Sequence, residues 1–237
     1  MILHPDKDPM GHAIDDFYRK NKIGRLIVNS SITEDEEIGV DYLFRTYDSM
    51  PEIEQLALNT CKGKVLDIGA AAGCHSLYLQ NKGFNVTAID ISELSVEAMK
   101  RQGLDSVQCI DFFDFEHKFD TLLLLMNGVG IAGDLDGLDH LLHKCKELLL
   151  PGGQVLLDSS DIVYMFEEDE DYLEEMDNYY GELNYQMKYK NIEGETFKWL
   201  FIDFAMLSEK ATDAGFECKL VIEGEHYDYL AQLTMLK

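Results

Sequence analysis

Short apolar segments alternate with amphipathic segments between residues 64 and 158, and this alternation constrains the fold more than any other feature of the sequence. The apolar segments are predicted to be strands at residues 64–68, 85–90, 106–110, 120–126 and 154–158. The amphipathic segments are predicted to be helices at residues 73–82, 93–102 and 135–149. Strands and helices that alternate at this spacing are typical of a parallel, doubly wound sheet. The four leucines within residues 120–126 have no polar face, which indicates a strand covered on both sides.

The segments on either side of this core follow different patterns. Residues 1–50 are largely polar, with short amphipathic pieces at 14–18 and 40–47, and they predict an N-terminal helical cap. Aromatic-rich runs at 185–189 and 196–201 predict a β-hairpin inserted after the fifth strand. A helix at 206–214 and two strands at 216–222 and 229–235 are expected to close the chain.

These elements combine into a predicted α/β fold of the Rossmann-like, doubly wound kind. Its sheet is expected to be mostly parallel and seven-stranded, with an antiparallel closing strand. We expect a single domain over residues 1–237. Its parts are an N-terminal cap at 1–50, a core at 51–160, an acidic segment with the hairpin insertion at 161–204, and the closing helix and strands at 205–237.

The charge balance limits the partners that this chain is expected to bind. Asp and Glu number 45 against 20 Lys and Arg, which gives a formal net charge of −25. Such a field repels phosphate backbones and anionic lipids, so neither nucleic acid nor membrane is an expected partner. The five cysteines show no C-x-x-C spacing, and the N-terminus lacks the pattern of a signal peptide. A reducing, cytoplasmic location is therefore expected.

The segment VLDIGAAAG, at residues 65–73, predicts a strand, a tight turn and the start of a helix. Small residues allow the backbone to approach a ligand, and the helix N-terminus favours a carboxylate. Asp90 follows Gly69 by 90 − 69 = 21 residues, the spacing at which an acidic residue reaches ribose hydroxyls in nucleotide-binding βαβ units. The dinucleotide pattern would also need glycines at positions that hold Ala71 and Cys74. A nucleoside ligand without phosphates, such as S-adenosylmethionine, therefore fits better than a dinucleotide.

Five motifs in order extend this pattern: VLDIGAAAG, VTAIDIS, CIDFFDF, FDTLLLLMNG and LLLPGGQVLLD. Together they resemble the motif series of the class I S-adenosylmethionine-dependent methyltransferases. The resemblance covers about residues 50–160, and the closing segment at 205–236 is also similar. Ala71 departs from it, since the family often has a glycine there. The resemblance implies S-adenosyl-L-methionine as the cofactor, the core at 51–160 as its binding region, and S-adenosylhomocysteine as a product.

The resemblance also implies a role for particular residues. Asp67 and the loop Gly69, Ala70, Ala71 and Gly73 would lie by the methionine part of the ligand. Asp90 would accept from both ribose hydroxyls, and Ile91 would pack on the adenine. Asp111 would accept from the adenine amino group, with Phe112 beside the ring. Asn127 and Gly128 would lie near the reactive methyl. Simpler roles stay open, namely a cap or turn for Asp67, Asp90 and Asn127, and replacement of Asp111 by Asp114.

The catalytic residues are not identified by any spacing. Candidates are Asn127, Tyr18 and Tyr164, with His12 and His226 as further general bases if the acceptor must lose a proton. His75 is a candidate for holding the carboxylate of the ligand. His140 and His143 lie one helical turn apart without a third ligand, so no metal site is expected.

We therefore expect direct methyl transfer to a small molecule. The sequence MNGVG lacks the Asn-Pro-Pro-aromatic signature of enzymes that methylate planar amides and exocyclic amines. That argues against nucleobase amines and glutamine side chains as acceptors. Two alternatives stay open, a non-catalytic S-adenosylmethionine-binding regulatory protein and a nucleotide-cofactor oxidoreductase on the same type of sheet.

Overall fold

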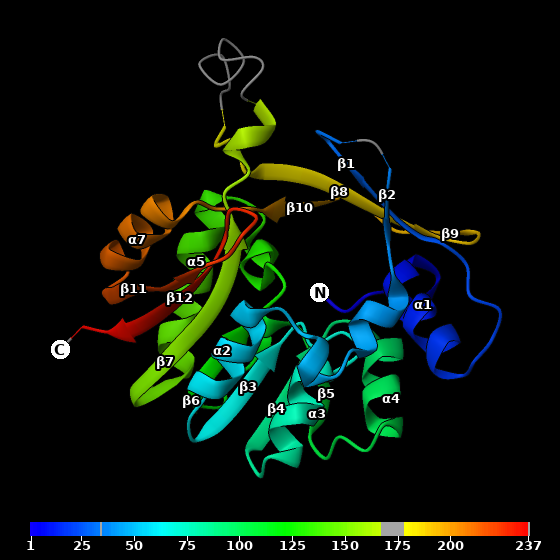
Figure 1. Cartoon of the computed structure of the whole chain (residues 1–237), viewed down its shortest axis with the longest axis horizontal. Helices are drawn as coiled ribbons and strands as arrows, with labels where there is room; N and C mark the ends of the chain where they lie inside the picture. The colour runs from blue at the N-terminus through cyan, green and yellow to red at the C-terminus, as the bar shows by residue number, and fades with distance from the viewer. Residues whose placement is uncertain (34, 167–177, 237) are drawn as a thin grey trace. The chain divides into compact units, whose positions relative to one another are not determined.

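The structure is a computed structural model that describes residues 1–33, 35–166 and 178–236 (Figure 1). The chain divides into two compact units. Unit 1 consists of residues 1–51, 62–117 and 185–197, and unit 2 consists of residues 52–61, 118–184 and 198–237. Residues 167–177, which belong to the acidic segment expected within 161–204, lie outside the described residues.

Unit 1 contains three parallel strands, β3 (Lys64–Ile68), β4 (Asn85–Asp90) and β5 (Val107–Cys109), in the order β3-β4-β5. Helix α3 (Cys74–Asn81) follows β3, helix α4 (Glu93–Arg101) follows β4, and the short helix η4 (Phe112–Asp114) follows β5 (Figure 1). The strands agree with the predicted ones to within one residue at each end. Parallel pairing brings the carboxyl ends of β3 and β4 to the same edge of the sheet.

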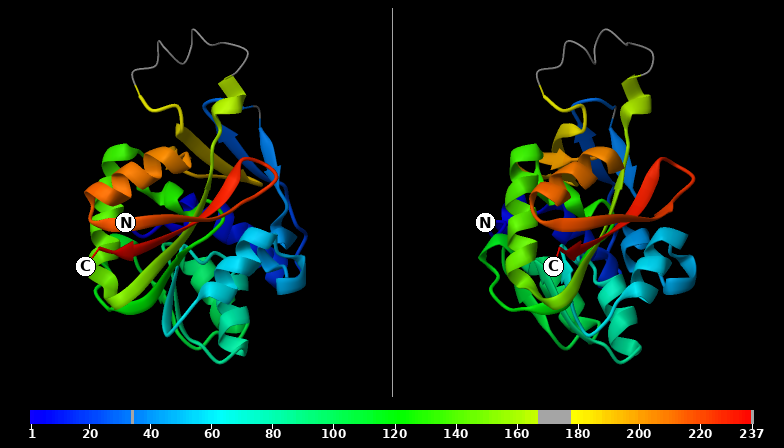
Figure 2. Two further views of the ribbon diagram at one scale, coloured as in Figure 1. Left: turned by 60° about the vertical axis from the view of Figure 1, so that its left-hand side comes forward. Right: turned by 90° about the vertical axis from the view of Figure 1, so that its left-hand side faces the viewer.

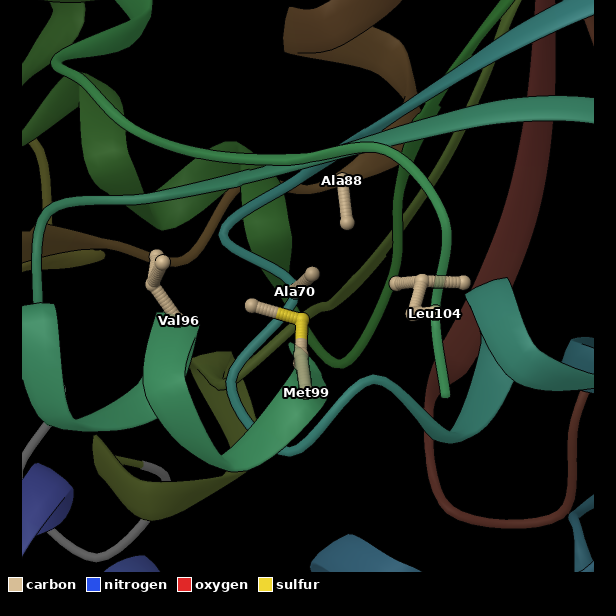
Figure 3. Packing of buried hydrophobic residues seen from close by; sticks show 5 residues of the cluster. All are labelled: Ala70, Ala88, Val96, Met99 and Leu104. Carbon is tan, nitrogen blue, oxygen red and sulfur yellow. The ribbon is translucent and has the colours of Figure 1, made fainter. Parts of the chain in front are cut away.

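Buried side chains join the loop after β3 to helix α4. Figure 3 shows this cluster, which consists of Ala70, Ala88, Val96, Met99 and Leu104. A Cβ on Gly73 would lie 2.8 Å from the Cγ of Met99, and the backbone there has φ = 81°. Glycine is therefore required at position 73 for space as well as for backbone conformation.

The N-terminal part of unit 1 is a cap that contains both helix and sheet. Its helices are η1 (Pro5–Lys7), α1 (Pro9–Tyr18), η2 (Val40–Phe44) and η3 (Tyr47–Ser49), and its strands are β1 (Leu26–Ser30) and β2 (Glu36–Ile38). The helix was predicted, whereas the two strands were not. Strand β1 pairs antiparallel with β2 on one side and with residues 185–189 of β8 (Glu182–Tyr189) on the other.

Strands form at both positions of the predicted insertion, as β8 and β10 (Phe197–Leu200). The rings of Tyr185 and Phe197 make an edge-on contact with centroids 6.1 Å apart. A short strand, β9 (Ile192–Glu193), pairs with the end of β8. The prediction missed that β8 also pairs with the N-terminal strand β1, because this contact joins segments far apart in the sequence.

Within unit 2, strands pair in the order β11-β12-β7-β6. They are β6 (Phe119–Leu124), β7 (Leu149–Ser160), β11 (Phe216–Glu223) and β12 (Asp228–Met235). Strand β7 is parallel to β6, and β12 is antiparallel to both β7 and β11. The helices in the described part of this unit are α2 (Glu52–Thr60), η5 (Gly128–Ala132), α5 (Leu135–Leu148), η6 (Val163–Phe166) and α7 (Phe204–Asp213). Helices α5 and α7 pack side by side (Figure 2).

Strand β7 is longer than predicted. The predicted strand begins at residue 154, but β7 also includes Pro151–Gly153. The pairing with β6 jumps there, from Phe119 opposite Leu149 to Thr121 opposite Gln154. The extra residues form an irregularity in which Pro151 and Gly152 are exposed, so the missing N–H of proline costs no pairing in the interior.

The seven predicted strands are all present, three in unit 1 and four in unit 2. The four leucines of the run in β6 are buried, as expected for a strand covered on both sides. The chain thus has a Rossmann-like α/β fold with mostly parallel strands and the antiparallel closing strand β12. The assignment of residues 1–237 to a single domain stays a prediction.

Candidate functional site

The loop between β3 and α3 has an unusual backbone. Gly69, Ala71 and Gly73 have φ values of 70°, 49° and 81°, all in the left-handed region. The N–H groups of Gly69 and Ala70 both donate to the carbonyl of Ile89, at 3.0 and 3.1 Å. The backbone of β4 thus fixes the loop. The positive φ of Ala71 accounts for the glycine that the family often has at this position, because glycine adopts this conformation without strain.

The carboxyl group of Asp90, the last residue of β4, is bonded to the loop. Its Oδ2 accepts from the N–H of Ala71 at 2.8 Å, and its Oδ1 accepts from the N–H of Ser92 at 2.8 Å. Burial raises the pKa of Asp90 to about 6, against the lowering effect of these two hydrogen bonds. Each carboxylate oxygen has a second lone pair, so Asp90 can still accept hydroxyl donors from a ligand.

Asp67 lies beneath the loop and is buried. Its Oδ2 accepts from the Oγ of Ser76 at 2.7 Å. Burial raises the pKa of Asp67, while His75 and Ser76 lower it. The side chain therefore ties β3 to the first turn of α3, which is a structural role at the base of the loop.

The residues expected around an adenine come from the ends of β4 and β5. The side chain of Ile91 is partly exposed, whereas Phe112 is buried. Asp111 accepts from the N–H of Phe113 at 3.0 Å, and the terminal amine of Met1 contacts the same carboxylate. Asp114, the alternative to Asp111, is exposed.

The N-terminal segment crosses this region of unit 1. The N–H of Leu3 donates to the carbonyl of Ile91 at 3.0 Å. The Oγ of Ser92 donates to Asp8, which also caps helix α1 by accepting from the N–H of Gly11 at 2.8 Å. The cap of unit 1 is thereby anchored at the end of β4, next to Asp90.

In unit 2, the turn after β6 is held by Asp158 of β7. Met126 and Asn127 have positive φ values of 61° and 55°. Their N–H groups donate to the two carboxylate oxygens of Asp158, at 3.0 and 2.7 Å. Gly128, which follows, is buried and begins η5. Sequence reasoning missed Asp158, although it is the last residue of the predicted strand 154–158, as Asp90 is of the predicted strand 85–90.

The side chain of Asn127 is engaged at both ends. Its Nδ2 donates to the carbonyl of Leu200 at 3.1 Å, and its Oδ1 accepts from the Oγ of Ser159 at 2.7 Å. The same Oγ accepts from the N–H of Ile202 at 3.0 Å. Asn127 thus joins the ends of β6, β7 and β10, and it is better placed to position this edge than to react.

The other candidate catalytic groups are spread over both units. In unit 1, the hydroxyl of Tyr18 donates to the carbonyl of Arg101 at 2.9 Å, and the Nε2 of His12 lies 3.1 Å from the carbonyl of Pro5. In unit 2, Tyr164 is exposed and stacks on Tyr227 with ring centroids 4.8 Å apart. His226 is also exposed. None of these contacts selects a general base.

A buried arginine near the loop at residues 69–73, called the glycine loop below, was not anticipated from the sequence. Arg45 is only 8% exposed, and its Nη2 lies 3.4 Å from the Nε2 of His75 in the first turn of α3. The amphipathic pattern at residues 40–47 contained this arginine, but the pattern does not tell an inward-facing arginine from an exposed one.

Within residues 1–33, 35–166 and 178–236, no three His, Cys, Asp or Glu side chains are grouped so that they could hold a metal ion. No helix in those same ranges is long and apolar enough to cross a membrane.

Comparison with known proteins connects this geometry to a family. A family model described as "Tellurite resistance protein TehB" matches residues 40–195. The crystal structure of a SAM-dependent methyltransferase from Bacteroides fragilis, in complex with S-adenosyl-L-homocysteine, is 48% identical to this chain. The match covers 100% of this chain and 98% of that one, with a TM-score of 0.94.

More distant relatives agree with this match. An uncharacterized methyltransferase from Staphylococcus carnosus (strain TM300) is 29% identical over 81% of this chain and 86% of its own length. The cypemycin N-terminal methyltransferase of a Streptomyces species is 32% identical over 41% of this chain, and the match spans only 42% of that relative. Two ribosomal RNA methyltransferases, from Pyrococcus horikoshii and Wolbachia pipientis, match 32% and 62% of this chain.

The family match covers more than half of the chain. It agrees with the glycine loop, with Asp90 at the end of β4 and with the strand order within each unit. The chain belongs to the TehB-type family of class I S-adenosylmethionine-dependent methyltransferases.

Proposed function

We propose that this methyltransferase acts on a small molecule. The observation that carries this proposal is the net charge of −25. Nucleic-acid binding gains most of its affinity from Lys and Arg contacts to phosphates, and a surface this acidic opposes such contacts. A small neutral or cationic acceptor meets no such barrier.

We further propose that residues of unit 1 hold the methyl donor as the family resemblance implies. Asp90 accepts the ribose hydroxyls, for which its oxygens retain lone pairs beside the bonds to Ala71 and Ser92. Ile91 offers a partly exposed apolar surface for the adenine. Asp111 is the proposed acceptor for the adenine amino group, and its contact with the amine of Met1 is consistent with an affinity for donors.

S-adenosylmethionine, when bound, would supply an activated methyl group on a sulfonium. A lone pair of the acceptor would bond to the methyl carbon, and the electrons of the broken carbon–sulfur bond would stay on sulfur. An acceptor that carries a proton would release it to solvent. The contribution of the chain is then mainly to hold and orient the reactants. In this proposal Asn127 is a positioning residue, because both ends of its side chain are bonded within unit 2.

The proposal is tested with S-adenosylmethionine carrying a radiolabelled methyl group. The purified chain is incubated with three separated cell fractions, namely small metabolites, total RNA and proteins. We expect label to enter only the small-metabolite fraction, together with formation of S-adenosylhomocysteine. The Asp90→Ala variant serves as the control and should lose this transfer.

Label in RNA would contradict the small-molecule proposal and would align the chain with the ribosomal RNA methyltransferases that it partly matches. Label in protein would point instead to a peptide acceptor, as in the name of the cypemycin enzyme. Either result would leave the assignment as a methyltransferase intact.

A further inference from the structure

We propose that Asp158 is a positioning residue for methyl transfer, because its carboxylate holds the turn at residues 126–128 in a strained backbone conformation. The proposal rests on the proposed function, in which the family resemblance puts Asn127 and Gly128 of this turn near the reactive methyl group. Asp158 is the last residue of the motif LLLPGGQVLLD, from which no role was inferred. All contacts that support the proposal lie within unit 2.

The turn after β6 contains two successive residues in the left-handed region. Met126 has a φ of 61° and Asn127 has a φ of 55°. A side chain makes this conformation costly, and asparagine tolerates it better than most residues, so the strain falls mainly on Met126. The side chain of Met126 is exposed, so its own packing does not impose the conformation. Strained backbone of this kind persists only where the surrounding structure holds it.

The carboxylate of Asp158 supplies this hold. Its Oδ2 accepts from the N–H of Met126 at 3.0 Å, and its Oδ1 accepts from the N–H of Asn127 at 2.7 Å. Hydrogen bonds to an ionised carboxylate are stronger than those to a neutral acceptor. Asp158 is also only 9% exposed, which limits competition from water. One side chain therefore binds the N–H groups of both strained residues.

The backbone that carries Asp158 is itself fixed. Strand β7 lies between β6 and β12 (Figure 1). Leu157 is opposite Leu124 of β6, and Asp158 is opposite Leu230 of β12. The carboxylate thus cannot shift without disturbing the pairing on both sides, and it sets the place of the turn relative to the sheet. A misplacement of about 1 Å in a group that positions reactants can cost up to about 100-fold in rate.

The test compares transfer rates with donor affinities. Rates are measured with radiolabelled S-adenosylmethionine at saturating concentration, on the metabolite, RNA or protein fraction that the wild type labels. Asp158→Asn keeps the shape of the side chain but replaces one acceptor oxygen with an amide nitrogen that cannot accept. It should lower the rate by about 10- to 100-fold. The affinity for S-adenosylhomocysteine, measured by calorimetry, should change by less than about threefold, because this ligand lacks the methyl group.

A second substitution tests whether Asp158 acts by holding Met126. Glycine adopts the left-handed conformation without strain, so Met126→Gly reduces the need for the carboxylate. In the Met126→Gly background, the loss of rate caused by Asp158→Asn should be smaller by at least about threefold. A loss that a purely structural role of Asp158 produced would not depend on the residue at position 126 in this way.

The matched control is the same substitution at another carboxylate of unit 2. Asp139 lies on the exposed side of α5, and its Oδ2 pairs with the Nζ of Lys210 at 3.0 Å. Asp139→Asn should keep both the rate and the affinity of the wild type.

A further variant keeps the test decisive if Asp158→Asn does not fold. Met126→Ile places a β-branched side chain where the backbone is left-handed, which increases the strain at an exposed position. It should lower the rate by at least about threefold with unchanged affinity for S-adenosylhomocysteine. An unchanged rate in this variant would overturn the proposal.

Three other outcomes would also overturn it. They are an unchanged rate in folded Asp158→Asn, an equal loss of rate in the wild-type and Met126→Gly backgrounds, and a loss of S-adenosylhomocysteine binding that parallels the loss of rate. The fraction that the wild type labels tests the proposed function, whereas the ratio of variant to wild-type rates on that fraction tests the role of Asp158. The two proposals can therefore fail separately.

Discussion

Asp90 does two things with one carboxyl group. It fixes the glycine loop through the N–H of Ala71, and it keeps lone pairs for a ligand. Burial raises its pKa to about 6, so the group changes charge close to neutral pH. Because ribose hydroxyls donate to the ionised form, a bound ligand should lower this pKa.

This leads to a prediction about pH. The affinity for S-adenosylhomocysteine should be constant above about pH 6.5 and should fall as the pH drops below about 6, by up to about tenfold per pH unit, because protonated Asp90 loses an acceptor. The carboxylate of the ligand stays ionised over this range. Titrations between about pH 5 and 7 measure the effect, and Asp90→Asn should bind weakly with little pH dependence. A wild-type affinity that does not change over this range would refute the ribose role of Asp90.

Asn127 and Ser159 form a second group of interacting residues, at the end of β6. Ser159 is buried, and its Oγ connects Asn127 with the N–H of Ile202. Replacing either residue leaves the partners without a hydrogen bond in a buried place, which is costly.

We predict that Asn127→Ala and Ser159→Ala each lower the free energy of unfolding by about 1–3 kcal/mol. The double variant should lose less than the sum, because the two side chains share a bond. Urea denaturation gives these values, with Ser160→Ala at the end of β7 as the control. Additive losses would show that the two residues act separately, and an unchanged stability of Asn127→Ala would contradict its positioning role.

At the scale of secondary structure, helix α5 depends on its N-terminal cap. The Oδ1 of Asp134 accepts from the N–H of Gly137 at 2.8 Å, and its Oδ2 pairs with the Nζ of Lys198 at 2.8 Å. The hydrogen bond from Lys198 is the main cause of a lowered pKa of Asp134. The stabilisation is therefore complete above about pH 4 and is lost as the pH falls through the lowered pKa.

We predict that Asp134→Ala lowers the free energy of unfolding by about 1 kcal/mol at neutral pH, the usual loss for such a cap. Asp136→Ala is a matched control in the first turn of the same helix and should change it by less than about 0.5 kcal/mol. The difference between the two variants should shrink in acid, as measured by denaturation between about pH 3 and 7. Equal effects would mean that helix charge, rather than the cap, carries the stabilisation.

At the scale of the whole molecule, the net charge of −25 is the dominant property. Like charges in a compact chain repel each other and oppose folding, and dissolved salt screens this repulsion. In the small-molecule proposal, the same field also opposes contact with RNA.

We predict that the melting temperature rises by about 2–5 °C between about 10 and 300 mM NaCl, because screening removes part of the repulsion. Choline chloride is the control and should give the same rise, since screening does not depend on the identity of the cation. A decrease with salt would mean that attractive ion pairs outweigh the net charge.

The order and type of most elements in residues 51–160 could be predicted from the sequence. Strand and helix periodicities act over a few residues, and glycines mark the turns, so β3, β4 and α4 could be predicted to within about one residue. The sequence also located the glycine loop and Asp90, because a strand end and a fixed spacing are local signals. The roles assigned to the site residues remain proposals for binding experiments.

Contacts between segments that lie far apart in the sequence could not be predicted and are seen only in the folded chain. The fold pairs β1 with β8, which lie about 160 residues apart, and it buries Arg45 against His75. It places the carboxylate of Asp158 under Met126 and Asn127. The sequence of a short polar strand such as β1 is the same whether its edge faces solvent or another strand. The same holds for Arg45, which could equally have been exposed or buried. The difference arises from burial and from hydrogen bonds to remote groups, which no local pattern contains.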